Sequence, residues 1–432
     1  MRRSAKSKHR IFNLGLMSLV FSILLSGLFA CSSPEIKKVT ASEILGSSDY
    51  PALCYGGYRS NSRKIEPSKA ELKEDLIILS ALGIKILRTY YAAEFGQAEN
   101  LLKVISELKE DNPNFEMYVM LGAWIECKNA WTDLPDHTLE NFEKNKNEVR
   151  TAIRLATSYP DIVKVIAVGN ESMVHWAASY FVHPEVVLRW VNLVQSLKSK
   201  GKLSKDLWVT SSDNFASWGG ADSAYHNASL LELIDAVDYV SMHTYPFHDT
   251  HYNGEFWIQP YSNDVLNKKS QIDFGMAKAI EHAKSQYSSV KSFMQENGIE
   301  KPIHIGETGW ATISTDNYGY QGSNAADEYK QRAYYLGMKN WADSIGLSCF
   351  FFEAFDEPWK DAKNTNGSEN HFGWIDIEGK AKYILWDQIE EGKLNGLKRN
   401  GIEITKSYNG NLDSMLFYSA APPIKVLEND TL

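Results

Sequence analysis

Residues 165–171 read VIAVGNE, an apolar run that ends abruptly in a glycine, an amide and a carboxylate. Such a run is typical of a strand that is buried on both faces, as in a parallel sheet covered by helices. The polar end would stand at the carboxyl end of the strand, which is where catalytic side chains lie in barrels of alternating strands and helices. Asn170 and Glu171 are therefore the first candidates for chemistry.

Seven further apolar runs occur along the chain, and an amphipathic stretch follows each of the eight runs. The expected strands cover residues 52–59, 84–91, 116–125, 165–171, 207–214, 237–247, 301–310 and 348–355. The expected helices cover residues 69–82, 98–111, 139–157, 186–200, 229–234, 276–297, 325–344 and 381–391. Eight strand-then-helix units in about 340 residues predict an α/β fold, a single (β/α)8 TIM barrel rather than two domains.

The start of the chain has the pattern of a secretory signal. Its first ten residues carry five basic side chains and no acidic one, and residues 11–29 are mostly apolar. We therefore expect residues 1–30 to be a signal peptide. The sequence LFAC at residues 28–31 resembles a bacterial lipobox, which would make Cys31 the lipidated first residue of the mature protein. An uncleaved anchor helix is the alternative, although the apolar run is short for a membrane span.

The rest of the chain divides into three parts. Residues 31–48 are polar and charged, as expected of a tether between lipid and domain. The predicted barrel occupies residues 49–394. Residues 395–432 form a short C-terminal extension, in which residues 402–407 and 414–418 could pair as a small hairpin packed on the barrel.

Charge and cysteine content narrow the class of protein. The chain has 432 residues and is 44% hydrophobic, enough for a large core. Loss of the first 30 residues leaves 40 Lys and Arg against 54 Asp and Glu, a net charge of −14. No nucleic-acid partner is expected, because phosphate binding needs a basic face. Cys54, Cys127 and Cys349 are expected to be buried free thiols, with one disulfide among them left open.

Neither a cofactor nor a metal is expected. No glycine-rich phosphate loop follows any expected strand, which disfavours a nucleotide cofactor. His243, His248 and His251 are close in sequence but lack the fixed spacing of metal ligands, so we interpret them as a solvent-exposed cluster.

A second glutamate ends another apolar run. Glu307 lies in HIGETGW, residues 304–310. At the ends of the fourth and seventh strands, Glu171 and Glu307 would face each other across the mouth of the barrel. Such a pair suits glycoside cleavage, in which one carboxyl protonates the leaving oxygen and the other attacks the anomeric carbon. Asn170 is placed to bind the sugar 2-hydroxyl. The alternative is a pair of glutamates that only form ion pairs at the rim.

Other strand ends supply candidates for substrate binding. Flat aromatic rings cover the apolar faces of sugars, although any single ring is more often part of the core. Trp310, the near neighbour of Glu307, and Trp374 are the candidate platforms. The remaining strand-end candidates are Tyr55, Arg88, Tyr90 and Tyr245. Further tryptophans near expected strand ends are Trp124, Trp131, Trp176, Trp218 and Trp359.

Residues 165–171 and 305–310 resemble the corresponding segments of the family 17 glycoside hydrolases, the β-1,3-glucanases of the clan with catalytic glutamates on strands four and seven. The resemblance extends over about residues 53–385. Its other segments are CYG at 54–56, LRTY at 87–90, MLG at 120–122, FEAFDEPWK at 352–360 and HFGW at 371–374.

This resemblance implies a role for each matching residue. Glu171 would be the acid/base and Glu307 the nucleophile of a retaining double displacement on β-1,3-glucan. Glu357 and Lys360 would support the rim, and Tyr245 would donate a hydrogen bond to the nucleophile.

Two segments depart from the plant members of that family. Residues 241–247 are more similar to the microbial members. Residues 248–270 form an insertion that is long for a barrel loop and could wall off one end of a cleft. Internal and terminal cleavage therefore both stay open.

We expect a monomeric, extracytoplasmic, lipid-anchored retaining β-1,3-glucanase at the outer membrane or cell surface, acting on β-glucan polysaccharide or oligosaccharide. One alternative is a transglycosylase, which would differ only in excluding water from the acceptor side. Another is a surface glycan-binding lipoprotein with an inert barrel, although a pure binder has no need of opposed carboxylates.

Overall fold

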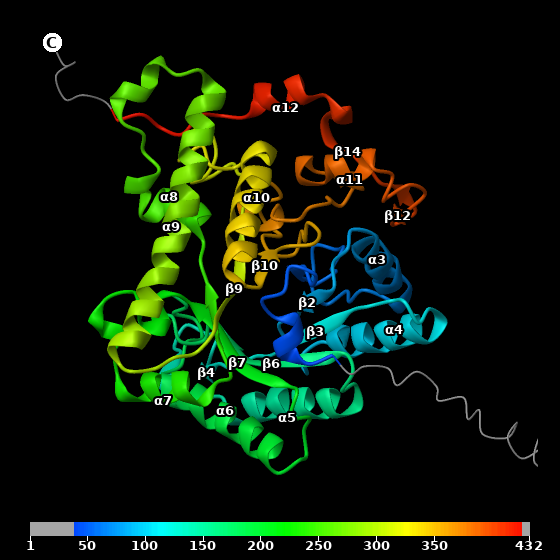
Figure 1. The fold of residues 1–432 in the computed structure, drawn as a ribbon, viewed down its shortest axis with the longest axis vertical. Coiled ribbons are helices and arrows are strands. Elements are labelled where there is room, and N and C mark those ends of the chain that lie inside the picture. Colours follow the sequence, from blue (N-terminus) through cyan, green and yellow to red (C-terminus); the bar gives the residue numbers. More distant parts are fainter. Residues whose placement is uncertain (1–38, 426–432) are drawn as a thin grey trace, which may run out of the picture. The chain divides into compact units, whose positions relative to one another are not determined.

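The computed structural model describes residues 39–425, in which eight parallel strands close into a barrel (Figure 1). The strands follow one another around the ring in chain order, and the last pairs with the first. They are β1 (Ala52–Cys54), β2 (Ile86–Arg88), β3 (Tyr118–Ala123), β6 (Val163–Asn170), β7 (Trp208–Asn214), β8 (Val240–His243), β9 (Ile303–Gly309) and β10 (Cys349–Phe352). The predicted (β/α)8 barrel is confirmed.

Helices follow the strands as the periodicity predicts. They are α3 (Lys69–Ala81), α4 (Gln97–Asp111), α5 (Phe142–Ser158), α6 (Pro184–Ser199), α7 (Ala228–Ala236), α9 (Lys268–Glu296) and α10 (Glu328–Ile345). Local signals set their ends: Ser68 and Glu71 form a reciprocal capping box at the start of α3. Gly346, with φ +70°, ends α10 in the left-handed conformation that glycine tolerates best.

The eighth helix is shorter than predicted over residues 381–391. A 3-10 turn (Tyr383–Leu385) leads into the five-residue α11 (Trp386–Glu390). The chain before it is extended, because β11 (Lys380–Ala381) pairs with β14 (Thr405–Lys406) of the C-terminal extension.

Two insertions lie at the carboxyl ends of the strands. After β3, the strands β4 (Cys127–Lys128) and β5 (Asp136–Glu140) form an antiparallel hairpin that the sequence did not predict. The following helix therefore begins at Phe142 rather than at residue 139. After β8, the segment predicted as a long loop contains α8 (Pro246–Tyr252) and the 3-10 turns Gly254–Phe256 and Tyr261–Val265.

The predicted tether is folded over its second half. The helix α2 (Ala41–Ile44) begins at a capping box formed by Thr40 and Glu43, and both of its ends are buried. The N–H of Gly46 donates to Ser348 Oγ at 2.8 Å, next to the start of β10. The expected signal peptide, Cys31 and the first part of the tether lie outside the described residues.

The C-terminal extension also differs from its prediction. A small hairpin does form, but from β12 (Lys398–Arg399) and β13 (Ile402–Glu403). Residues 414–418 lie in α12 (Leu412–Tyr418), because the Asn411 side chain accepts the N–H of Ser414 and caps a helix there. Arg399 anchors the extension on the barrel, since its Nε donates to the buried Asp75 at 2.9 Å.

Two further findings concern the described part of the chain. None of its helices has the length and apolar character needed to cross a bilayer. Cys54, Cys127 and Cys349 are buried free thiols, so no disulfide joins them.

Candidate active site

Glu171 and Glu307 lie at the carboxyl ends of β6 and β9, with β8 close to both. His243, at the end of β8, is paired in register with Glu307, and its Nδ1 is 3.1 Å from Glu171 Oε1. A sharp turn places Glu171: Gly169 has φ +89° and Glu171 itself has φ +47°. The Glu171 N–H then donates to Ser212 O at 2.9 Å. The two glutamates predicted as a pair therefore share one site.

Three donors hold the Glu307 carboxylate. Arg88 Nη1 lies 2.5 Å and the Tyr90 hydroxyl 3.0 Å from its Oε2, and the Tyr245 hydroxyl donates to its Oε1 at 2.6 Å. The contact expected of Tyr245 is thus present. Burial alone would raise the pKa of Glu307. The positive charge of His243, which is protonated only at acidic pH, the guanidinium of Arg88 and the two hydroxyl donors outweigh burial and lower the pKa to about 2. Glu307 is therefore ionised at neutral pH.

Arg88 also fixes the predicted sugar-binding amide. Its Nη2 donates to Asn170 Oδ1 at 2.5 Å, and its Nη1 also donates to Gly306 O at 2.9 Å. Because the amide oxygen of Asn170 accepts a hydrogen bond from Arg88, the amide nitrogen is the end that can donate to a ligand.

Glu171 has the opposite electrostatic environment. Burial, and then the negative charges of Glu307 and Asp213, raise the pKa of Glu171 well above its usual value. Its neighbour His243 adds no compensating charge, because burial lowers the pKa of His243 to about 3. Glu171 therefore keeps its proton under conditions in which Glu307 is a carboxylate.

A chain of hydroxyl groups orients His243. Ser212 Oγ lies 2.8 Å from His243 Nε2 and 2.8 Å from Ser241 Oγ. Gly306 leaves room for these serines, since a Cβ there would lie 2.0 Å from Ser241 Oγ. His243 is fully buried, so the prediction of a solvent-exposed histidine cluster is wrong for this member.

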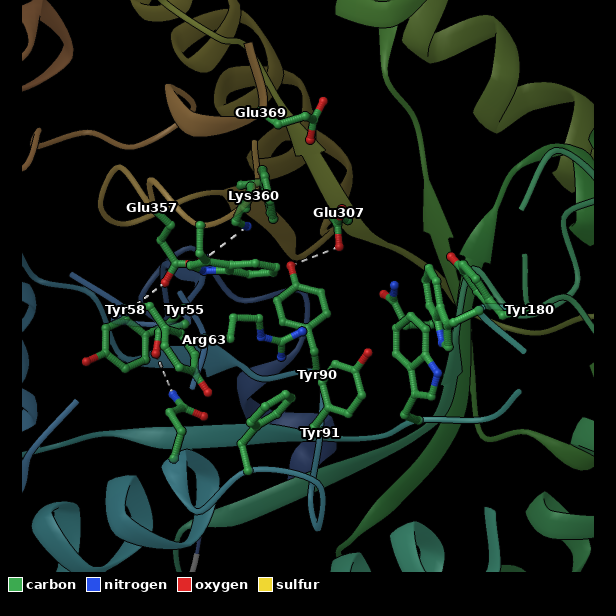
Figure 2. A pocket seen from close by; sticks show the side chains of 18 residues that line it. Tyr55, Tyr58, Arg63, Tyr90, Tyr91, Tyr180, Glu307, Glu357, Lys360 and Glu369 are labelled. Carbon is green, nitrogen blue, oxygen red and sulfur yellow. Dashed lines mark hydrogen bonds and ion pairs between the residues drawn. The ribbon is translucent and has the colours of Figure 1, made fainter. Parts of the chain in front are cut away.

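A cavity of about 380 Å³ opens beside Glu307 (Figure 2). Its wall is largely aromatic, with Tyr55, Tyr58, Tyr90, Tyr91, Phe95, Trp124, Trp131, Tyr180, Phe352 and Trp359. Its polar lining consists of Arg63, Gln97, Asn170, Glu307, Glu357, Lys360 and Glu369, with the backbone of Gly56. A concave, mainly aromatic wall with a few fixed polar groups is typical of a carbohydrate site.

The predicted rim residues form one connected network. Glu357 accepts hydrogen bonds from the Tyr58 N–H and from Trp359 Nε1, each at 2.9 Å. Lys360 Nζ lies 3.0 Å from Glu353 Oε2 and 3.5 Å from Glu357 Oε2. Burial raises the pKa of Glu353 well above its usual value, although Lys360 opposes the shift. This network holds the loop after β10 against the loop after β1.

Two of the predicted platforms do not line the cavity. Trp310 is 1% exposed and donates from Nε1 to Ala325 O at 2.8 Å. Trp374 is 5% exposed and packs edge-on against Tyr335. Both indoles are buried in packed regions, because a position near a strand end does not determine which way a side chain faces.

The aromatic wall is instead formed by stacked rings from different loops, whose proximity the sequence did not predict. Tyr91 stacks on Trp124 with ring centroids 4.7 Å apart, and Trp131 stacks on Tyr180 at 4.8 Å. Trp131 lies between β4 and β5 and is 56% exposed. Although Trp124 and Trp131 stood near expected strand ends, nothing in the sequence indicated the hairpin that brings Trp131 to the wall.

Glu148 of α5 is a further residue that the sequence did not single out. Its carboxylate accepts backbone N–H groups of Ala92, Ala93, Glu94 and Trp124 at 2.7 to 3.3 Å. One buried carboxylate thus fixes the loop after β2 and the end of β3, which carry Tyr91 and Trp124. Within residues 39–425, no group of three or more His, Cys, Asp or Glu side chains is arranged to hold a metal ion.

Comparison with known proteins identifies relatives along most of the chain. Residues 52–373 match the model of the BtgE/BtgC glycoside hydrolase domain. A glucan 1,3-beta-glucosidase of Arthroderma benhamiae is 26% identical over 324 residues, which are 73% of this chain and 84% of that protein. A putative glucan endo-1,3-beta-glucosidase btgC of Aspergillus niger is 26% identical over 71% of this chain, and the match spans 38% of that longer protein.

Solved structures share the same barrel. The crystal structure of an endo-laminarinase from Formosa Hel1_33_131 is 55% identical, with a TM-score of 0.88, and covers 91% of this chain and 100% of its own. A glycoside hydrolase family 17 β-1,3-glucanosyltransferase from Rhizomucor miehei is 17% identical, with a TM-score of 0.53 over 78% of this chain and 97% of its own, and shares the fold. Because the family model covers most of its length, the chain belongs to the BtgE/BtgC glycoside hydrolase domain family.

Proposed function

We propose that this protein hydrolyses β-1,3-glucan with retention of anomeric configuration. The observation that carries the proposal is that two carboxyl groups in one site differ in their protonation state. Arg88 and two tyrosine hydroxyls keep Glu307 ionised, whereas burial and neighbouring negative charge keep Glu171 protonated. Carboxyl groups whose environments separate their pKa values are the usual acid and nucleophile of retaining glycosidases.

In the first step, Glu307 attacks the anomeric carbon while Glu171 gives its proton to the glycosidic oxygen. The bond between that carbon and oxygen breaks, the shortened glucan leaves with a free hydroxyl, and a glycosyl ester forms on Glu307. In the second step, Glu171, now a carboxylate, takes a proton from water. The water oxygen attacks the anomeric carbon, the ester breaks, and both carboxyl groups return to their starting states.

The surrounding residues would support both steps. Arg88 keeps the attacking carboxylate charged and also orients Asn170, whose amide nitrogen can bind the sugar 2-hydroxyl. That contact strengthens toward an oxocarbenium-like transition state. His243 is a positioning residue, since its Nδ1 contacts Glu171 and a serine orients its other nitrogen.

The substrate class is supported by the relatives. The names of the Arthroderma and Aspergillus proteins specify glucan 1,3-β-glucosidases, and the 55% identical Formosa protein is an endo-laminarinase. The segments that resemble the family 17 glycoside hydrolases include both glutamates. The aromatic cavity beside Glu307 suits a glucan chain.

We also propose that the protein is an extracytoplasmic lipoprotein attached to a membrane through Cys31. The basic start, the apolar run and the LFAC segment at residues 28–31 support this location.

Glu307→Gln removes the attacking charge while keeping the size of the side chain. We expect kcat for release of reducing sugar from linear β-1,3-glucan to fall by at least about 10³-fold, because no glycosyl ester can form. The matched control is Glu300→Gln, the same change at an exposed residue just before β9, which should leave kcat unchanged. Near wild-type hydrolysis by Glu307→Gln would refute the nucleophile assignment.

Glu171→Ala removes the proton donor and the base. We expect a large loss on glucan but a small loss in the first step on a nitrophenyl glycoside, whose leaving group needs no proton. Azide should restore turnover and give a β-glycosyl azide. The wild-type pH profile should fall at high pH, where Glu171 loses its proton, and this limb should vanish in the variant. Failure of azide to rescue the variant would remove the acid/base role.

Cys31→Ala tests the lipoprotein proposal. We expect the variant to lose incorporation of labelled palmitate, because the side chain proposed to be lipidated would be gone. Serine at position 32 offers a control, since Ser32→Ala should keep the label. Palmitate that stays on the Cys31→Ala protein would contradict lipidation at this residue.

A further inference from the structure

A guanidinium group lies in the wall of the cavity without a carboxylate partner. Arg63 lines the cavity, and its Nε is buried with no hydrogen-bond partner. None of the ion pairs formed within the described part of the chain involves its side chain. Buried donors in folded proteins nearly always have an acceptor. Of the four arginines in the described part of the chain that have a buried nitrogen without one, Arg63 is the one that lines the cavity.

Aromatic rings from three loops hold the guanidinium in place. Its Cζ lies 4.2 Å from the ring centre of Phe95, 4.3 Å from Trp359, 4.5 Å from Tyr91 and 5.6 Å from Tyr58. In Figure 2 the guanidinium points from the side of Tyr58 toward Tyr90 and Tyr91. Cation–π contacts fix the plane of a guanidinium but satisfy none of its N–H groups. The hydroxyl groups of Tyr58 and Tyr91 also interact with the guanidinium. Because Nε is buried, the two terminal nitrogens of Arg63 are the groups that an acceptor in the cavity can reach.

We assign the end of the cavity that holds Arg63 to the glycone side of the bond to be cleaved. Glu307 and Asn170 line it, whereas Glu171 does not. In a retaining mechanism the nucleophile faces the sugar that becomes attached, and the acid faces the departing part. The Tyr90 hydroxyl contacts Glu307, while the ring of the next residue, Tyr91, contacts Arg63. Arg63 thus lies beyond the sugar that reacts.

The charges around the cavity favour a neutral acceptor. Glu307, Glu357 and Glu369 line it together with Arg63 and Lys360. Lys360 is already within 3.5 Å of two carboxylates, Glu353 and Glu357. An anionic group would meet more negative than unpaired positive charge here, whereas a sugar hydroxyl can accept from the guanidinium without that repulsion.

We propose that Arg63 forms a subsite for a glucosyl residue on the glycone side, beyond the sugar whose bond is cleaved. Its N–H groups donate to hydroxyl oxygens of that sugar, and the aromatic rings hold the guanidinium ready for this contact. The assignment rests on the retaining β-1,3-glucanase function proposed above, and it makes Arg63 a determinant of how strongly longer chains are preferred.

Nitrophenyl glycosides of glucose and of β-1,3-linked di-, tri- and tetrasaccharides test this directly, because the aglycone is fixed and only the glycone grows. For Arg63→Ala we expect kcat/KM to fall roughly tenfold on the glycones that reach Arg63, as for loss of a charge-assisted hydrogen bond. The nitrophenyl glucoside should react at the wild-type rate. Arg63→Lys keeps the charge but loses the planar donor edge, so its kcat/KM on the same glycones should fall by less than that of Arg63→Ala.

Arg150→Ala, at an exposed position of α5, is the matched control and should follow the wild type at every length. An equal loss at all glycone lengths would show a general structural role for Arg63, and no loss at any length would show no subsite; either result overturns the proposal. Circular dichroism and thermal unfolding check that the Arg63 variants are folded.

Calorimetric binding separates this inference from the proposed function. In the Glu307→Gln protein, Arg63→Ala should weaken binding of a β-1,3-linked tetrasaccharide roughly tenfold. Unchanged affinity would overturn the subsite. If the wild type releases no nitrophenol from any glycoside, the proposed hydrolysis fails, and the calorimetric comparison still decides whether Arg63 binds glucan.

Discussion

The buried ion pair between Arg88 and Glu307 is the interaction on which the site depends. Arg88 is at the end of β2 and Glu307 is in β9, strands that β1 and β10 separate in the ring, so the pair forms only when the barrel is closed. The two side chains are 1% and 9% exposed. Removing one partner of such a pair typically costs about 3–5 kcal/mol, because the other charge stays buried and unpaired. The fold and the charge state of the site are therefore coupled.

The charge of Glu307 also acts on the rest of the mouth of the barrel. It helps to raise the pKa of Glu171, to which the neutral His243 offers a contact without a counter-charge. Asn170 is oriented by the same guanidinium that pairs with Glu307. Arg88 on one glutamate, and burial with neighbouring negative charge on the other, therefore give two chemically identical side chains different protonation states, which is the division that a double displacement requires.

Much of this could be predicted from the sequence, since buried strands and amphipathic helices repeat with clear periods and the polar ends of parallel strands converge. Glu171, Glu307 and the Tyr245 contact follow from that logic and from family resemblance. Local pattern did not predict the positions of two tryptophans. The direction of the Trp310 side chain and the polar hairpin β4–β5 that carries Trp131 depend on tertiary packing. Residues 414–418 have a strand-like composition and were expected in a hairpin, but the Asn411 cap starts a helix there.

The central claim is that Glu307 becomes covalently attached to the glucan. A 2-deoxy-2-fluoro β-1,3-gluco-oligosaccharide with a good leaving group tests it, because the fluorine destabilises the oxocarbenium-like transition states and the leaving group lets the first step proceed. Mass spectrometry of the intact protein and of its peptides should find one fluoroglycosyl group, attached to Glu307. No mass increase with turnover of the unfluorinated substrate, or attachment to another residue, would contradict the account.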